Sequence, residues 1–322
     1  MMKLKQTVGA ALIAAAMLPA TGMAETLKLA VLKIGTVNWE LDTIKHYGLD
    51  EAAGFEMEVQ GMAGNPATRI AFQAGEVDAM VADWLWVARQ RADGKDYVFI
   101  PYSTAVGGLL VAADSPVQSL ADLKGQKIGI AGGPVDKSWL ILQAFAKQQS
   151  NMDLAAETEQ VFGAPPLIFK SGLSGEVAGV INFWHFMAKM KAKGFREVVS
   201  VADASAALGL DPKTPLLGYV VTGDLARSKP ELLNGLITAS RAAKDILAND
   251  DAAWDRLRPM MNAGDDAAFE ALKDGFRAGI PTADPVDLDA AKAMFALMVE
   301  LGGEELMGSA TELPDGVFFT GE

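Results

Sequence analysis

Four tryptophans and a set of small polar residues follow predicted strands, where their side chains could hold a small solute. Indole rings stack on flat rings and attract organic cations, while hydroxyl, amide and carboxylate groups hydrogen-bond the polar ends of a ligand. In open α/β sheets a ligand lies beyond the carboxyl ends of the strands. The candidate ligand-binding residues are therefore Thr36, Asn38, Trp39, Asp83, Trp84, Ser103, Thr104, Gly133, Asp136, Ser138, Trp139, Asn182, Trp184 and His185.

Each of these side chains also has a purely structural interpretation. A single tryptophan is packed in a core about as often as it contacts a ligand, so the argument for an aromatic site rests on all four together. The turn Gly132–Ser138 opens a predicted helix whose free N–H groups could bind an anion, but Asp136 or Ser138 could cap that helix instead. Asp83 and Asn182 also suit helix N-caps.

Residue types that would support an enzyme or a metal site are scarce. The chain has no cysteine, so a thiolate nucleophile, a disulfide and a lipid-modified cysteine anchor are all excluded. His46 and His185 are the two histidines, and His46 is expected inside a helix as a surface or packing residue. No Ser/His/Asp spacing and no phosphate-binding glycine loop is recognisable. We therefore expect no catalytic residue, no metal and no cofactor.

The charge of the chain argues against a nucleic-acid partner. The formal net charge is −13, and loss of the first 24 residues, which carry two lysines and no acid, would make it −15. Phosphate-backbone binding needs a basic patch. The densest basic stretch, 189–196, is better explained as the solvated face of one helix.

Predicted strands and helices alternate along the first part of the chain. The apolar pattern predicts strands over 27–34, 55–59 and 77–81, and helices over 37–53 and 66–74. This alternation is typical of an α/β fold with mainly parallel strands.

An internal repeat suggests two similar lobes. The segment 75–81, Gly-Glu-Val-Asp-Ala-Met-Val, has a counterpart at 175–181, Gly-Glu-Val-Ala-Gly-Val-Ile. The same offset of 100 residues continues through the following helix and relates the four tryptophans in two pairs. Two short matches can arise by chance, but a shared offset favours two α/β lobes in tandem with a ligand cleft between them.

The chain is expected to cross between the lobes within 97–113 and near 216–222. After Pro230 the pattern predicts helices over 231–249, 251–260, 266–277 and 286–301, which should return to the first lobe. We therefore expect a signal peptide at 1–24, a first lobe at 25–106, a second lobe at 107–217, and a return to the first lobe with C-terminal helices at 218–322.

The N-terminus has the pattern of an export signal. Lys3 and Lys5 precede an apolar run over 8–18, and small residues lead to a cleavage site after Ala24. The run is shorter than the roughly 20 residues that span a membrane. The alternative is a buried N-terminal helix. The export reading predicts a periplasmic, monomeric protein that is not embedded in the membrane.

Four segments between about residues 26 and 245 match a known family. They are Ile-Ala-Phe-Gln-Ala-Gly-Glu-Val-Asp-Ala at 70–79, Ser-Leu-Ala-Asp-Leu-Lys-Gly-Gln-Lys-Ile-Gly-Ile at 119–130, Gly-Glu-Val at 175–177 and Phe183-Trp184. In these segments the chain resembles the nitrate/taurine/alkanesulfonate group of ABC-importer binding proteins, which also includes thiamine-precursor binders.

This resemblance implies a two-lobed periplasmic-binding fold of type II, with a cleft for one small-molecule ligand. It also implies docking onto a membrane permease with a cytoplasmic ATPase. Two other functions are kept as alternatives, because fold does not settle function. One is an enzyme on the same fold that acts on a pyrimidine or chorismate-like metabolite, and the other is a sensor that reports a solute to a receptor.

Overall fold

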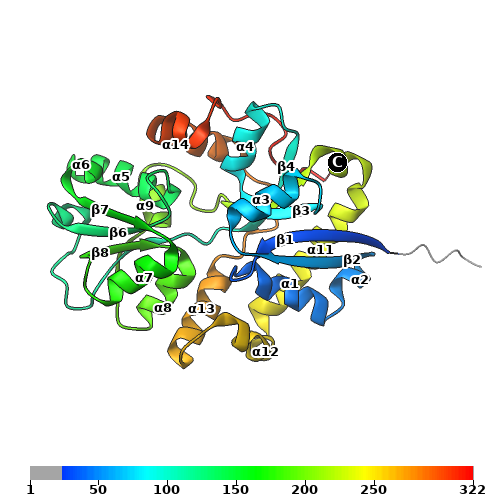
Figure 1. The fold of residues 1–322 in the computed structure, drawn as a ribbon, viewed down its shortest axis with the longest axis horizontal. Helices are drawn as coiled ribbons and strands as arrows, with labels where there is room; N and C mark the ends of the chain where they lie inside the picture. The colour runs from blue at the N-terminus through cyan, green and yellow to red at the C-terminus, as the bar shows by residue number, and fades with distance from the viewer. Residues whose placement is uncertain (1–23, 322) are drawn as a thin grey trace, which may run out of the picture.

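The computed structural model describes residues 24–321, which form two lobes built on two separate sheets (Figure 1). The first sheet has the order β2-β1-β3-β10-β4. In it, β10 runs antiparallel to both of its neighbours, whereas β2, β1 and β3 are parallel. The strands are β1 Glu25–Leu32, β2 Phe55–Met62, β3 Ala79–Asp83, β4 Tyr97–Ser103 and β10 Leu217–Thr222.

The second sheet repeats the first in order and direction. Its order is β7-β6-β8-β5-β9, and β5 is the antiparallel strand. The strands are β5 Gly108–Val111, β6 Lys127–Ala131, β7 Glu159–Gly163, β8 Gly179–Asn182 and β9 Arg196–Ser200. The predicted α/β class and the two-lobed architecture are therefore confirmed.

The internal repeat corresponds to one structural unit in each lobe. Helix α3, Asn65–Gln73, and helix α7, Pro165–Leu173, are related by the predicted offset of 100 residues. Each leads through a left-handed glycine into β3 or β8, and then into helix α4, Trp84–Ala92, or α8, Trp184–Lys191. The shared register thus reflects two copies of a helix–turn–strand–helix unit.

Helices cover both faces of each sheet. In the first lobe α1, Val37–His46, packs on α11, Pro230–Asn249, while α3 and α4 pack on β1, β3 and β4. In the second lobe α7 and α8 pack on the sheet, and α5, Lys137–Ser150, contacts α9, Val201–Ala207. The short helices are α2 Leu49–Ala52, η1 Leu120–Leu123, α6 Leu154–Glu157 and α10 Gly223–Ser228.

The chain passes between the sheets twice. The first crossing is the segment Thr104–Gly107 between β4 and β5, and the second is the stretch from α9 to β10. Both crossings lie at the same edge of the two sheets, the edge formed by β10 and β4 in one and by β5 and β9 in the other. A pair of connections at one edge leaves the remaining carboxyl ends of the strands facing each other.

The C-terminal helices do more than return to the first lobe. Helix α12, Asp251–Met261, packs on α1. Helix α13, Asp266–Ala278, packs instead on α8 of the second lobe, and α14, Leu288–Met307, contacts both α4 and α5. These two helices therefore contact both lobes, on different sides of the crossings (Figure 1).

The predicted signal peptide at 1–24 falls, except for Ala24, outside the described residues. Within residues 24–321 no helix combines the length and the apolar character needed to cross a membrane.

Candidate functional site

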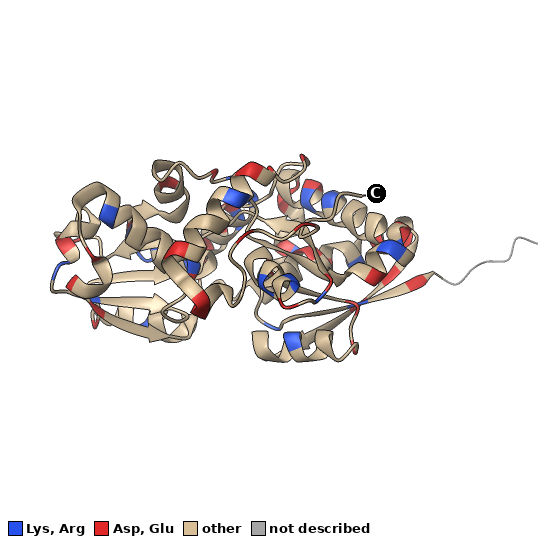
Figure 2. Cartoon of the chain, turned by 90° about the horizontal axis from the view of Figure 1, so that it is seen from above, with Lys and Arg blue, Asp and Glu red and all other residues tan. Residues whose placement is uncertain are grey.

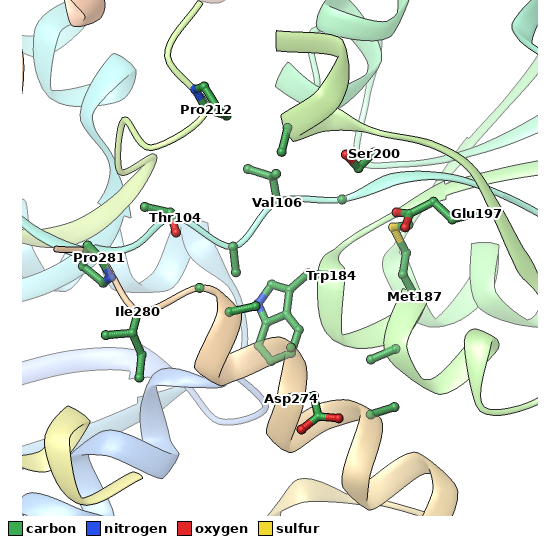
Figure 3. A pocket seen from close by; sticks show the side chains of 18 of the residues that line it. Thr104, Val106, Trp184, Met187, Glu197, Ser200, Pro212, Asp274, Ile280 and Pro281 are labelled. Atoms are coloured by element: carbon green, nitrogen blue, oxygen red, sulfur yellow. The ribbon is translucent and has the colours of Figure 1, made fainter. Parts of the chain in front are cut away.

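The lobes and crossings enclose a pocket of about 710 Å³. Its walls come from the crossing Thr104–Gly107, from one side of α8, and from α13 with the loop that follows it (Figure 3). The lining includes the side chains of Trp184 and Met187 on α8, and Asp274 on α13. The pocket therefore has apolar walls from both lobes with a few polar groups.

Trp184 stands at the start of α8 and links the pocket to the first lobe. Its ring meets the ring of Trp39 edge-on, with centroids 6.0 Å apart. Gly275 of α13 lies directly under the indole, since a Cβ at this position would be 2.8 Å from its Cζ3 atom. The predicted candidates Trp39 and Trp184 are thus brought together across the lobes, although Trp39 itself is buried.

The segment before Trp184 is fixed by Asn182. Its side-chain amide donates to the Pro165 carbonyl oxygen over 3.0 Å, and its Oδ1 accepts from the backbone N–H of Phe183 over 2.8 Å. The N-cap position of α8 is Phe183, which makes no side-chain cap. Asn182 therefore fixes the backbone just before α8 and does not cap the helix.

A second point of contact between the lobes is the ion pair of Asp83 and Lys137. The Nζ atom of Lys137 lies 2.9 Å from Asp83 Oδ2, while Asp83 Oδ1 caps α4 by accepting from the N–H of Trp86. Burial raises the pKa of the Asp83 carboxyl, but the charge and hydrogen bond of Lys137 outweigh it, and the pKa ends below its usual value.

Asp136 caps α5, which bears on the predicted anion site at this turn. Its Oδ1 accepts from the N–H of Trp139 over 3.1 Å. Burial raises the pKa of the Asp136 carboxyl, against the charge of Lys137 and the cap hydrogen bonds, and the neighbouring Asp83 adds to the rise. An anion at this helix start would have to displace a carboxylate from the same donors.

His185 lies beside Trp184 among aromatic rings. Its imidazole is 4.6 Å from the ring of Phe186 and 5.8 Å from that of Trp184, measured between centroids. Burial, with a smaller contribution from the charge of Lys189, lowers the pKa of His185 from 6.5 to about 4. The imidazole is therefore neutral at physiological pH.

The charged groups that line the pocket are partly paired. Lys191 donates to Glu197 Oε2 over 2.6 Å, and both residues line the pocket wall of the second lobe. Asp274 is exposed on α13, and Lys213 is exposed on the second crossing. The lining thus carries two basic and two acidic side chains and no excess of either charge.

Several other predicted residues form hydrogen bonds to backbone carbonyl oxygens. Asn38 donates to the carbonyl oxygens of Leu32 and Gly35 and so closes the loop after β1. Ser103 donates to the Gly279 carbonyl oxygen over 3.3 Å, and the N–H of Thr104 donates to the same oxygen over 2.9 Å. Thr104 also lines the pocket.

The remaining candidates lie away from the pocket or at its margin. Trp84 is fully buried and stacks on Phe295 of α14. Trp139 is also buried, on α5. Thr36 and Gly133 are half-buried in the turns that precede α1 and α5, and Ser138 is half-buried in the first turn of α5.

Some residues that line the pocket were not among the predicted candidates. Met187 and Lys191 follow Trp184 at helical spacing on the same side of α8, so the periodicity of that helix could have indicated them. Asp274 and Gly275 belong to a helix distant in sequence, and no local signal places it on α8. Lys137 directly follows the candidate Asp136, yet its partner is 54 residues away.

No group of three or more His, Cys, Asp or Glu side chains is arranged to hold a metal ion within residues 24–321.

Comparisons with known proteins give a family and a fold. A family model described as NMT1/THI5 like matches residues 48–253. No curated protein matches the sequence. Among solved structures, the periplasmic aliphatic sulphonate binding protein SsuA of Escherichia coli superposes with a TM-score of 0.70 at 18% identity, covering 89% of this chain and 91% of that one.

Two further structures are similar over nearly the whole chain. The alkanesulfonate-binding protein SsuA of Xanthomonas axonopodis pv. citri, bound to MOPS, has a TM-score of 0.66 at 18% identity and covers 92% of this chain and 97% of that one. The ligand-binding component of an ABC-type import system of Staphylococcus aureus, with zinc bound, has a TM-score of 0.65 at 12% identity, over 89% and 99%. At these identities the likeness concerns the fold.

Proposed function

We propose that this chain, which belongs to the NMT1/THI5-like family, binds one small solute between its lobes and delivers it to the permease of an ABC importer. The observation that carries this proposal is the pocket of about 710 Å³, whose walls come from both lobes and from the crossing between them. Small-molecule sites typically measure roughly 300–1,000 Å³ and favour such interfaces.

The structural neighbours support the same proposal. Two of them are sulphonate-binding proteins, and a third is the ligand-binding component of an import system. We further propose that the chain binds its solute without converting it, acts as a monomer, and works in the periplasm after export by residues 1–24. A cytoplasmic ATPase would then drive release into the cell through the permease.

The residues that we propose as ligand contacts are those of the pocket wall. Trp184 offers an indole face, Thr104 a hydroxyl group, and Met187 an adaptable apolar surface. Trp39 contributes indirectly, because its buried ring supports the ring of Trp184. The other predicted residues around the strand ends are proposed to shape the cleft when the lobes move.

Removal of a tryptophan ring tests this site. Solutes that raise the melting temperature of the purified protein are identified from a metabolite collection, and the affinity of the best one is measured by calorimetric titration. In Trp184→Ala we expect binding at least tenfold weaker, because a ring packed against the ligand contributes area burial plus about 0.5–1.5 kcal/mol. Trp39→Ala is expected to weaken binding as well, since the Trp184 ring loses its support.

The matched control is Trp86→Ala. Trp86 is half-buried on α4, stacks on Tyr97 and does not line the pocket. This variant should lose stability and keep its affinity. Unchanged affinity in Trp184→Ala and Trp39→Ala, with lowered melting temperatures, would show that these rings only pack helices.

A further inference from the structure

Polar contacts between the two lobes are few. Among the ion pairs of residues 24–321, the one between Lys137 and Asp83 joins the second lobe to the first. The others lie within a lobe, within the C-terminal helices, or between those helices and the first lobe. The contact of Trp39 with Trp184 across the lobes, in contrast, is between apolar rings. This ion pair is therefore the polar link that opening of the cleft must break.

The ion pair is held in place on both sides. Asp83 is fixed by the N–H of Trp86 at the start of α4, and Lys137 is the first residue of α5, directly after the cap Asp136. The Asp83 side chain is 12% exposed and that of Lys137 is 29% exposed, so the pair is largely shielded from solvent. Shielding strengthens the attraction relative to that of an exposed pair.

Two other charged groups act on this contact. Asp136 faces Asp83 as a second carboxylate, and Arg69 adds a positive charge that lowers the pKa of Asp83. The guanidinium of Arg69 is 5.2 Å from the ring centroid of Trp86 and makes no ion pair with Asp83. Lys137 is therefore the direct partner of the buried carboxylate.

We propose that Asp83 and Lys137 are positioning residues that draw the two lobes together before a solute is bound. This inference rests on the proposed function, because the closed form is the one that brings both walls of the pocket together. A ligand that needs the closed form binds with an apparent affinity reduced by the fraction of protein that is closed. The ion pair thereby sets the fraction of protein that is closed. It also occupies the Lys137 ammonium, which is then not available to an anionic solute.

The absence of cysteine permits a direct measurement of closure. Gln73→Cys on α3 and Lys170→Cys on α7 place one exposed thiol on each lobe for a donor and an acceptor dye. In this labelled background Asp83→Asn removes the charge, while asparagine still caps α4. We expect single-molecule energy transfer without added solute to show the closed-to-open ratio reduced about threefold to tenfold.

Two controls separate closure from general stability. Lys137→Arg retains the charge and should retain most of the closed population. Lys124→Gln removes an ion pair within the second lobe, Lys124 to Glu157 at 2.7 Å, and should leave energy transfer unchanged. The melting temperature of Asp83→Asn is measured in parallel, because a merely structural role would lower it without changing the interlobe distance of the folded protein.

Wild-type energy transfer in both Asp83→Asn and Lys137→Gln would overturn the proposal. This result would leave the proposed function intact, provided that a solute still binds and closes the cleft. Failure of the proposed function would give a different result. No solute would then bind to the wild type, to Lys137→Arg or to Lys124→Gln, whatever fraction of each protein is closed.

Discussion

His185 connects the packing at the start of α8 to pH. Burial lowers its pKa from 6.5 to about 4, so between these values the unfolded chain binds a proton that the folded protein does not. Stability therefore falls as the pH is lowered from 6.5 toward 4. We expect His185→Phe to remove about 1–3 kcal/mol of this loss, measured by urea unfolding at pH 7 and at pH 4.5.

The control is the other histidine. His46 is exposed at the end of α1, and His46→Gln is unfolded in parallel under the same conditions. Carboxylates also titrate toward pH 4, so the difference between variants is the informative quantity. If His185→Phe loses as much stability on acidification as the wild type, the imidazole is protonated in the folded protein.

At the scale of elements, the sequence indicated which segments are strands and helices better than it indicated their ends. The predicted helix over 37–53 is divided, because Gly48 adopts a left-handed φ of 62° between α1 and α2. The predicted helix over 286–301 runs on to Met307 across a kink at Gly303. Glycines interrupted one helix and bent another, and local propensity alone does not distinguish these outcomes.

The site itself was only partly predictable, since equivalent positions have different neighbours in the two lobes. Trp84 and Trp184 hold the same place in the repeat, yet Trp84 is covered by Phe295 of α14 and Trp184 lines the pocket. The difference comes from the C-terminal helices, which have no counterpart in the repeat. A pattern within each lobe therefore located the candidate loops but did not determine which indole lines the pocket.

A buried network of charged and hydroxyl groups joins α1 to α11. The Nζ atom of Lys244 lies 2.5 Å from Glu40 Oε2, and Glu40 Oε1 accepts from the hydroxyls of Tyr219 and Ser240 over 2.7 and 2.6 Å. The same Nζ is 4.7 Å from the ring centroid of Tyr102. Burial lowers the pKa of Lys244 against the attraction of Glu40. The ion pair of Glu40 and Lys244 thus connects two helices that are far apart in the sequence.

The response of this pair to mutation should be strongly non-additive. Glu40→Leu leaves a buried ammonium without its partner and should cost about 3–5 kcal/mol of unfolding free energy. The double variant Glu40→Leu with Lys244→Met removes both charges and should be more stable than either single variant. Urea unfolding of the four proteins measures the coupling.

An exposed pair supplies the comparison. The side chains of Lys229 and Glu25 form an ion pair and are both about half exposed. Lys229→Met breaks this pair and should change the unfolding free energy by less than about 1 kcal/mol. If the double variant at Glu40 and Lys244 loses the sum of the two single losses, the charges do not interact as a unit.

At the scale of the whole molecule, the two lobes differ in how the chain builds them. All five strands of the second sheet lie between Gly108 and Ser200. The first sheet instead contains β10, which enters from Leu217 and lies between β3 and β4. Basic and acidic residues are interspersed along both lobes in the cartoon of Figure 2. Independent folding should therefore be decided by strand continuity more than by charge.

We expect the fragment 107–217 to fold alone and the fragment 25–106 not to fold. The fragment 107–217 contains a complete sheet with α5, α7, α8 and α9. The fragment 25–106 lacks β10, so β3 and β4 would lose their common neighbour.

Circular dichroism melts test this prediction, with the chain 25–322 as the reference. The fragment 107–217 should melt cooperatively at a lower temperature than the reference, because the surface of α5 that meets α14 and the surface of α8 that meets α13 become exposed. Joining 25–106 to 218–322 through a short glycine linker should restore a cooperative melt, since β10 returns to its place. A cooperative transition in 25–106 alone would contradict this division of the chain.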